Sequence, residues 1–407
     1  MALVAGLVAA APAEAAKVET VTSGADGHSY RPSVSFDGRF VAFESNADSL
    51  SRADDDRVRN VYVRDMRTGR VTLVSRGSGP AGAPANGASS RASLSADGRF
   101  VAFQTQARNL GLDPGPSWRG QSAAYVRDLR LGVTHAVGIG DEPSLSSDGR
   151  YVAYVSKDPA FTRGSDDPQI VRRDLRDGTT VLVSQSPEGA PGDFSSFAPA
   201  IAGDGNRVAF ESFAENFDRF GEEGEFHKVF LRDVAAGTTE RVSRGSGPGG
   251  PPGDGASSDP SISGDGRSVA FWTTDSVSFA AGERLPDAYH VWVRELAADR
   301  IELVDRASGE HGAPGNSSAE IVSLSHDGRF AAFESLASNL VPPGAKGRVG
   351  VFVRDLRAHR TELISRGRER GTGVEPAISG DGRYVVFERS SRTGVKHVMR
   401  ARRGTRG

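Results

Sequence analysis

One block of about a dozen residues recurs along this chain, and its recurrence constrains the fold more than any other feature. Within this block an Asp-Gly pair recurs seven times, at successive spacings of 60, 51, 56, 61, 62 and 54 residues. The seven pairs begin at Asp37, Asp97, Asp148, Asp204, Asp265, Asp327 and Asp381. Six positions after each Asp stands Phe or Tyr, and two positions after it stands Arg in six of the seven units. Self-similarity at such a spacing indicates a repeat architecture.

Each unit contains four segments with the character of short strands. In the first unit these are P-S-V-S from Pro32, R-F-V-A-F from Arg39, V-Y-V-R-D from Val61 and R-V-T-L-V-S from Arg70. Asp-Gly between the first two segments predicts a tight hairpin, because glycine accepts the positive φ of such a turn. The Asp of Asp-Gly is predicted to cap its own turn, and the Asp of V-R-D to pair with a nearby Arg. We therefore predict an all-β protein of four-stranded antiparallel units.

Seven such units predict a seven-bladed β-propeller, with a linear β-solenoid as the alternative. The ends of the chain favour the propeller. The seventh unit stops after its third strand, at Arg400, and the N-terminal segment from Val18 aligns with the fourth-strand segment from Thr361. The N-terminal strand is thus predicted to complete the last blade and close the ring, which also protects sheet edges.

The first sixteen residues differ from the rest. They form an apolar run that ends in the small-x-small pattern Ala13-Glu14-Ala15, which predicts a signal peptide over residues 1–16. A positively charged start is missing, which an upstream true start would explain, and an apolar disordered start is the alternative. The domains predicted beyond it are one propeller over 17–400 and a basic, solvated tail over 401–407. We expect an exported protein: secreted, periplasmic or associated with the cell envelope.

Composition argues against several classes of partner and binding site. A formal net charge of −2 gives no reason to expect a nucleic acid or an anionic membrane as partner. No other stretch has the roughly 18 to 20 apolar residues of a membrane span. Cysteine is absent, and the eight histidines show no metal-binding spacing, so we predict no metal and no cofactor. The stretch Asp54-Asp55-Asp56 is interpreted as a solvated acidic turn rather than a calcium loop.

Signatures of covalent catalysis are missing as well. No G-x-S-x-G motif occurs, and Ser325-His326-Asp327 is interpreted as a hairpin, because consecutive residues of a tight turn cannot form a proton relay. Residues repeated in every unit are poor catalytic candidates, since a single active site breaks the symmetry.

The pattern P-S-[IVL]-S-x-D-G-R-x-V-A-F-x-S, followed by V-[FYW]-V-R-D and T-x-L-V-S, resembles the TolB-like, WD-type propeller repeat of bacterial proteins. The resemblance covers essentially everything after Lys17. It implies a β-propeller that serves as a binding platform or as an accessory domain of a peptidase, so it leaves the function open. The Gly/Pro-rich stretches between units, such as the one from Ser75, are interpreted as flexible connectors.

Function is expected where the seven-fold symmetry breaks. The position just before the first strand is predicted to lie near the channel mouth, and it carries charge in five units. Its occupants are Arg31, Arg91, Glu142, Ala198, Asp259, Ile321 and Glu375. A charge-divided mouth would orient a ligand or a partner's side chains, and mutual neutralisation of solvated charges is the alternative.

The loops of the fourth and fifth units form a second asymmetry, because they concentrate aromatic residues in an aromatic-poor chain. The candidates for partner anchors are Phe217, Phe220, Phe226, Tyr289 and Trp292, with Trp118 as a weaker one. Packing under their own loops is the alternative.

Together these observations predict a monomeric, non-catalytic binding or scaffolding module for a protein or a cell-surface component. The alternative is a hydrolase or lyase at the channel mouth that acts through Arg31, Arg91, Glu142 and Glu375. Such an enzyme requires a pocket and a carboxylate of shifted pKa. A structural envelope repeat without a ligand is a third hypothesis.

Overall fold

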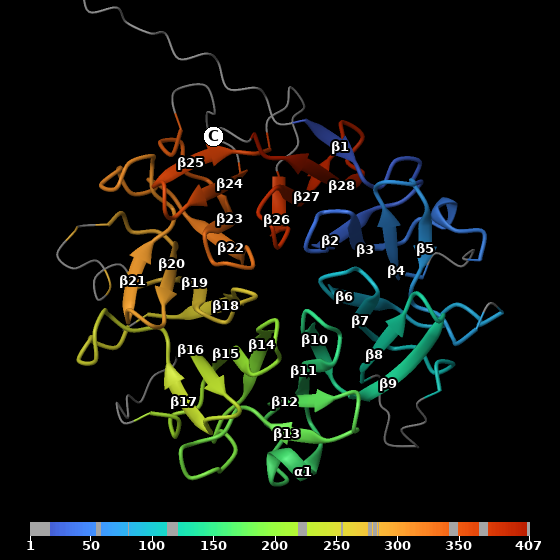
Figure 1. Cartoon of the computed structure of the whole chain (residues 1–407), viewed down its shortest axis with the longest axis horizontal. Helices are drawn as coiled ribbons and strands as arrows, with labels where there is room; N and C mark the ends of the chain where they lie inside the picture. The colour runs from blue at the N-terminus through green and yellow to red at the C-terminus, as the bar shows by residue number, and fades with distance from the viewer. Residues whose placement is uncertain are drawn as a thin grey trace, which may run out of the picture.

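Seven sheets surround a central axis in the computed structural model (Figure 1). It describes residues 17–53, 58–79, 81–111, 121–218, 226–253, 255–275, 279, 283, 285–341, 349–365 and 373–404. Within these residues, 28 strands form seven four-stranded antiparallel sheets, which follow one another around the ring in chain order. The predicted seven-bladed, all-β propeller is confirmed.

The strands take four positions in the blades, from the axis outward (Figure 1). The innermost strands are β2 (Ser29–Val34), β6 (Ser89–Leu94), β10 (Asp141–Leu145), β14 (Ser196–Ile201), β18 (Ser257–Ile262), β22 (Ala319–Leu324) and β26 (Gly373–Ile378). The second strands are β3 (Phe40–Ser45), β7 (Phe100–Thr105), β11 (Tyr151–Ser156), β15 (Arg207–Ser212), β19 (Ser268–Thr273), β23 (Phe330–Ser335) and β27 (Tyr384–Ser390). The third strands are β4 (Asn60–Asp65), β8 (Ala123–Asp128), β12 (Gln169–Asp174), β16 (Lys228–Asp233), β20 (His290–Glu295), β24 (Gly350–Asp355) and β28 (Lys396–Arg402). The outermost strands are β5 (Val71–Leu73), β9 (Val133–Ile139), β13 (Thr180–Leu182), β17 (Thr238–Arg241), β21 (Arg300–Leu303), β25 (Arg360–Leu363) and β1 (Val18–Thr20).

Only short helical segments accompany the strands in the described part of the chain. They are α1 (Pro159–Thr162) and the 3-10 turn η1 (Asp48–Leu50). No helix among the described residues is long and apolar enough to cross a membrane.

The N-terminal strand closes the ring, as predicted. β1 pairs antiparallel with β28, with Thr20 opposite Met399, and completes the seventh sheet. The interpretation of the C-terminal tail as solvated was wrong for Arg403, which pairs with Glu362 of blade 6 at 2.6 Å. Arg400, in β28, pairs with Glu19 of the same blade and donates to the carbonyl oxygen of Gly38 in blade 1 at 2.6 Å. Both residues thus join the last blade to its neighbours in space.

The repeated polar residues build the hairpins. Asp37 accepts hydrogen bonds from the amide of Arg39 at 2.9 Å and from the hydroxyl of Ser35 at 3.0 Å, as expected for a capped turn. Arg39 in turn pairs with Asp65 of V-R-D at 2.7 Å. The equivalent pairs are Arg99–Asp128, Arg150–Asp174 and Arg329–Asp355, and in blade 4 the equivalent Asn206 donates to Asp233 at 2.9 Å. The hydrogen bond from Arg150 lowers the pKa of Asp174 to about 2, so this carboxylate stays charged.

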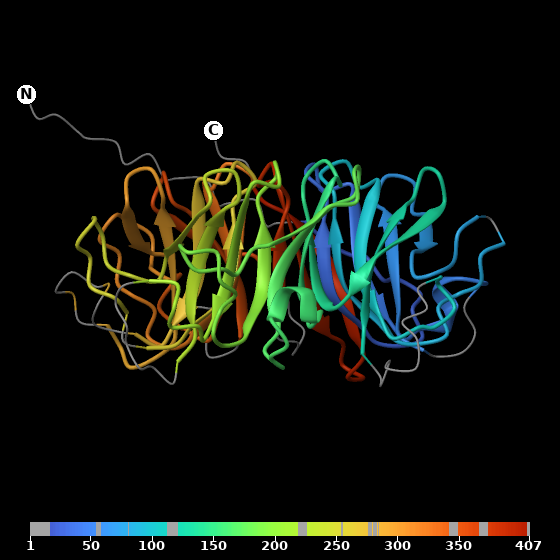
Figure 2. The ribbon, with the colours of Figure 1, turned by 90° about the horizontal axis from the view of Figure 1, so that it is seen from below.

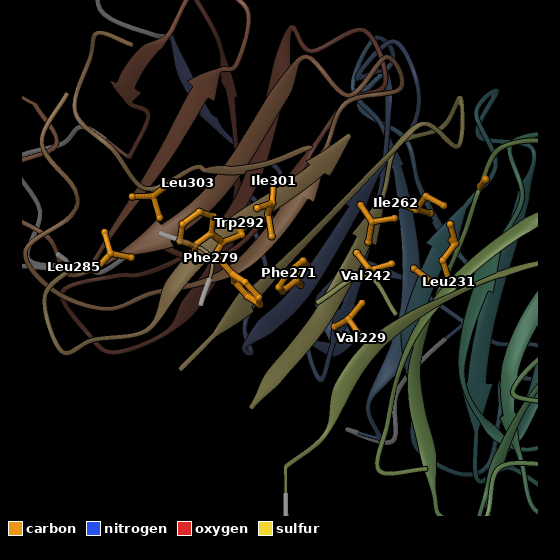
Figure 3. Close-up of a cluster of buried hydrophobic side chains, with 13 residues drawn as sticks. Val229, Leu231, Val242, Ile262, Phe271, Phe279, Leu285, Trp292, Ile301 and Leu303 are labelled. Atoms are coloured by element: carbon orange, nitrogen blue, oxygen red, sulfur yellow. The ribbon is translucent and has the colours of Figure 1, made fainter. Parts of the chain in front are cut away.

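The hydrophobic core lies between the blades. Figure 3 shows the cluster between blades 4 and 5, in which Val229, Leu231 and Val242 face Phe271 and Trp292. The repeated aromatics at the position of Phe271 are fully buried in six blades and nearly so in the third. Burial of apolar surface between neighbouring sheets therefore holds the ring together.

The Arg of V-R-D joins blades 1, 2, 5 and 6 to the preceding blade. Arg354 is fully buried and donates to the carbonyls of Arg306 and Ala307 in the preceding connector, at 3.3 and 3.2 Å. The described connectors are folded hairpins, in which, for example, Gly77 donates to Ala83 at 2.9 Å. Their interpretation as flexible connectors was wrong, because the buried guanidinium groups bind their carbonyl oxygens.

The two faces of the disc differ (Figure 2). The hairpin face carries the Asp-Gly turns, and the loop face, at the lower edge of Figure 2, carries the connections between second and third strands, including α1. Backbone hydrogen bonds link the hairpins of successive blades around the axis, for example from Phe36 to Ala96 and from His326 to Gly380, both at 2.9 Å. His326 thus lies in a hairpin, as predicted, and Ser325 donates to Asp327 rather than to His326.

Candidate binding site in the central channel

The first strand of every blade carries a bulge. In blade 1 the pairing of β2 with β3 shifts between Tyr30 and Ser33, and Arg31 in the bulge has a φ of 44°. Its six equivalents have φ between 43° and 55°: Arg91, Glu142, Ala198, Asp259, Ile321 and Glu375. Non-glycine residues rarely adopt this conformation, so its recurrence shows that blade geometry imposes it. These residues were predicted to precede the first strand, and they lie inside it because the strand continues across the bulge.

The bulged residues surround one cavity of about 540 Å³ on the propeller axis. Its charged lining consists of Arg31, Arg91, Glu142, Asp259 and Glu375, so the structure brings together all five charged residues that the sequence singled out at this position. Proline residues, Ala198 and Ile321 provide apolar surface between them. A cavity of this volume accommodates a small molecule or a few side chains of a partner.

A second set of polar residues supports the bulges, and the sequence analysis missed it. The amide of Arg91 donates to Glu44 of the preceding blade at 2.8 Å, and the amide of Glu375 donates to Glu334 at 3.0 Å. Glu388, Gln104 and Glu211 accept in the same way from the next blade. The signal was available, since all five directly follow the repeated aromatic.

The charges around the channel are unevenly paired. On one side, Glu44 pairs with Arg59, Glu142 with Arg91 and Glu388 with Lys396, at 3.1 to 3.3 Å. On the other side, five carboxylates form no ion pair within 4 Å with any described side chain. They are Glu211, Asp259, Glu320, Glu334 and Glu375, which belong to blades 4 to 7. The guanidinium of Arg31 likewise has no ion-pair partner among the described residues.

Burial raises the pKa of several of these carboxyl groups. It raises the pKa of Glu334 to about 7, where the charges of Glu375, Glu320 and Glu388 add to the effect. Burial also raises the pKa of Glu211 to about 6, and it raises the pKa of Glu375. These groups therefore hold protons at pH values at which a solvated glutamate is charged.

The predicted aromatic anchors divide into two groups. Phe217 and Trp292 are only 1% and 3% exposed and pack in the core, so their assignment as anchors was wrong. Phe217 packs on Phe210 and Phe230, and Trp292 lies in β20 and packs between blades 4 and 5. Phe226 and Tyr289 are 49% and 41% exposed at the loop face. Phe220 lies outside the described residues, as do Trp118 and the acidic stretch 54–56.

Two further aromatics lie beside the exposed ones. Trp272 stacks on Tyr289, with ring centroids 5.3 Å apart, and its indole N–H donates to Asp259 at 2.9 Å. Phe213 contacts the imidazole of His227 edge to face, at 5.2 Å between centroids. Trp272 thus connects exposed Tyr289 at the loop face with Asp259 in the lining of the cavity.

His227 extends this region but forms no catalytic relay. Its Nε2 atom and the hydroxyl of Ser258 form a hydrogen bond, and burial lowers the pKa of the imidazole. Ser258 is itself buried, which removes its oxygen from contact with a substrate. Within the described part of the chain, no three His, Asp or Glu side chains converge on a point where they could hold a metal ion.

Comparisons with known proteins identify the architecture. No family model matches this chain, and no curated protein matches it. Among solved structures, it is similar to the propeller domain of the Trilobed protease from Pyrococcus furiosus, at 11% identity and a TM-score of 0.57, over 93% of this chain and 94% of that one. It is also similar to an oligogalacturonate lyase in complex with manganese, at 13% identity and a TM-score of 0.55, over 95% and 93%. The shared feature is the β-propeller fold.

TolB from Acinetobacter baumannii is also among the similar structures, at 18% identity and a TM-score of 0.40, over 74% of this chain and 64% of that one. The protease propeller is described as having an open velcro topology, whereas this propeller closes its ring through β1 and β28. At these identities the comparisons establish the fold and leave the function to be argued from the site.

Proposed function

We propose that this chain is a non-catalytic binding module and that the central cavity holds part of its ligand. The observation that carries the proposal is the cavity lining, in which charged residues differ from blade to blade while the blade framework repeats. A framework residue serves the fold in every blade. A lining that varies on that framework instead supports recognition, because the fold accepts Arg, Glu, Asp, Ala and Ile at the same position.

The proposed partner is a protein or a cell-surface component that approaches from the loop face. Exposed Phe226 and Tyr289 lie on this face, and exposed aromatics are the commonest anchors of protein interfaces. We further propose that the chain acts as an exported monomer, on the strength of the apolar segment over residues 1–16.

The test uses capture and identification of the partner, followed by a binding titration. Residues 17–407 are immobilised, and proteins and glycans from the native envelope and secreted fractions are captured and identified. Saturable binding of the purified partner is then measured for the parent chain and for Ala198→Arg. Arg is compatible with the left-handed backbone at this position, since Arg31 and Arg91 occupy it in blades 1 and 2.

Ala198→Arg is expected to fill the cavity and abolish binding without unfolding the protein. Two variants locate the face. Phe226→Ser is expected to weaken binding, and Leu131→Ser, at a 66% exposed position in the turn between β8 and β9, is the matched control. Undiminished binding by Ala198→Arg would refute the cavity as the binding site.

The alternative function is a hydrolase or lyase that acts in the cavity through Arg31, Arg91, Glu142 and Glu375. One observation favours it: the raised pKa of Glu375 and Glu334, because an acid protonated near neutral pH can donate a proton to a leaving group. Against it, Glu334 accepts a backbone hydrogen bond that joins two blades. A substrate panel assayed with the parent chain and with Glu375→Gln separates the two functions. Turnover that disappears in Glu375→Gln would establish the enzyme.

A further inference from the structure

The loop-face end of the cavity contains a region that combines carboxylates with aromatic rings. We call it the acidic corner and define it by Glu211, Asp259, Trp272, Tyr289 and Glu320. Asp259 lines the cavity, and its neighbours come from blades 4, 5 and 6. We propose that the acidic corner binds an organic cation, a primary amine or a guanidinium, carried by the ligand. This inference rests on the proposed function and specifies the chemistry of its ligand.

The first argument is the missing counter-charge. Glu44, Glu142 and Glu388 each have a Lys or Arg partner at 3.1 to 3.3 Å. Glu211, Asp259 and Glu320 have none within 4 Å among the described residues. Glu211 and Glu320 are half-buried, and exposed Asp259 lies beside them. A cation stabilises carboxylates that are partly removed from water, and here no described side chain of the protein supplies one. A bound cation would give the carboxylates of blades 4 to 6 the positive partner that Lys and Arg side chains give to Glu44, Glu142 and Glu388.

The second argument is the placement of the aromatic rings. The hydrogen bond from Trp272 to Asp259, at 2.9 Å, fixes the indole beside the carboxylate. Tyr289 stacks on that indole at an interplanar angle of 29° and is 41% exposed. A cation between a carboxylate and an aromatic face gains from both the negative charge and the ring quadrupole.

The third argument separates an organic cation from a bare metal ion. Aromatic faces do not coordinate divalent metal ions, and among the described His, Asp and Glu side chains no three converge for coordination. An amine or guanidinium uses both halves of the acidic corner. It also reaches the carboxylates through hydrogen bonds, which tolerate the longer separations between blades.

Trp272 supplies the probe for the experiment. The chain has three tryptophans, of which Trp292 is buried and Trp118 lies outside the described residues. Trp292→Phe is conservative, because Phe230 and Phe352 occupy the same register in blades 4 and 6. In a chain that carries Trp118→Phe and Trp292→Phe, the emission of Trp272 reports directly on the acidic corner.

Agmatine and the neutral-ended peptide acetyl-Gly-Arg-Gly-amide are titrated separately into this chain. Saturable changes in Trp272 emission are expected, and Asp259→Asn should weaken binding roughly tenfold. Asn keeps an acceptor for the indole and tolerates the left-handed backbone, so the fold is expected to be retained. Glu310→Gln, at an exposed connector position, is the matched control and should leave binding unchanged.

The two probes distinguish the source of the cation. Tighter binding of the peptide assigns the corner to a basic side chain of a partner protein, and tighter binding of agmatine assigns it to a small amine. The absence of saturable binding by either probe, or equal affinity of parent and Asp259→Asn, would overturn the inference. If Ala198→Arg still abolishes capture of the partner in that case, the cavity function stands and only its cation specificity falls.

Discussion

At the scale of single residues, the glutamate after the repeated aromatic connects fold and site. Glu334 accepts the amide of Glu375 in the bulge of the next blade, and the bulge directs residue 375 to the cavity. Gln104 makes the same bond to Glu142 at 2.7 Å in blade 2. The hydrogen bond therefore requires an acceptor and no charge, so the charge of Glu334 costs free energy that the fold does not need.

Glu334→Gln is expected to flatten the pH dependence of stability. Between the pKa of an unfolded glutamate, near 4.5, and that of folded Glu334, about 7, only the folded chain holds the proton. The free energy of unfolding therefore falls as pH rises across this window through this group. The charges facing it are Glu375, Glu320 and Glu388.

Urea unfolding midpoints at pH 5 and pH 8 measure this effect. The parent chain should lose more stability between the two values than Glu334→Gln, and the variant should be the more stable of the two at pH 8. Glu310→Gln again serves as the exposed control. Equal slopes in parent and Glu334→Gln would show that this carboxyl group is charged throughout.

At the scale of elements, the third strand of each blade organises its surroundings. Its Asp pairs with an Arg of the same blade, and in blades 1, 2, 5 and 6 its Arg reaches back to the preceding blade, as Arg354 does to Arg306 and Ala307. Arg173 of blade 3 differs, because β9 leads almost directly into β10 and no long connector precedes this blade. Its guanidinium donates to the hydroxyl of Thr180 in its own blade, at 3.1 Å.

Arg354→Ala is expected to destabilise the protein by about 2 to 4 kcal/mol, because it removes the guanidinium donor from the half-buried carbonyl groups of Arg306 and Ala307. Arg173→Ala removes the equivalent side chain where it binds no connector, and should cost about 1 kcal/mol or less. Chemical denaturation of both variants checks the difference. A loss of the same size in both would show that the connector contacts contribute little.

At the scale of the whole molecule, stability depends on closure of the ring. The closing sheet joins residues at opposite ends of the chain, with Thr20 opposite Met399. Closure also shapes the site, because it brings blade 7 against blade 1. The carboxylate of Glu388 in blade 7 accepts a hydrogen bond from the amide of Arg31 in the bulge of blade 1, at 2.8 Å. An opened ring would therefore disturb the cavity as well as the edge strands.

A disulfide across this closure tests that dependence. The chain has no cysteine, so the double variant Thr20→Cys/Met399→Cys can form one disulfide only. The oxidised form is expected to be more stable than the reduced form of the same variant by about 2 to 5 kcal/mol, because the bond closes a very long loop. Thermal unfolding with and without reductant measures the difference. Equal stability of the two forms would mean that the closing strand stays paired when the protein unfolds.

The amino-acid sequence by itself determined the number of blades, their four strands, the capped Asp-Gly hairpins and the closure of the ring. These features depend on local turn chemistry and on repetition, both of which are visible in one dimension. It also selected the five charged residues of the cavity, because alignment of the seven units reveals a position that carries charge in five of them.

Only the tertiary structure decided which of these residues have partners. Three features depend on contacts between neighbouring blades or between the two ends of the chain. They are the burial of Phe217 and Trp292, the ion pairs of Arg400 and Arg403, and the carboxylates of blades 4 to 7 that have no ion pair among the described residues. Those contacts join segments some fifty residues apart or at opposite chain ends, so no local pattern encodes them. The bulge also acts only in the folded protein. It turns residue 31 and its six equivalents toward the axis, where these residues from all seven blades meet.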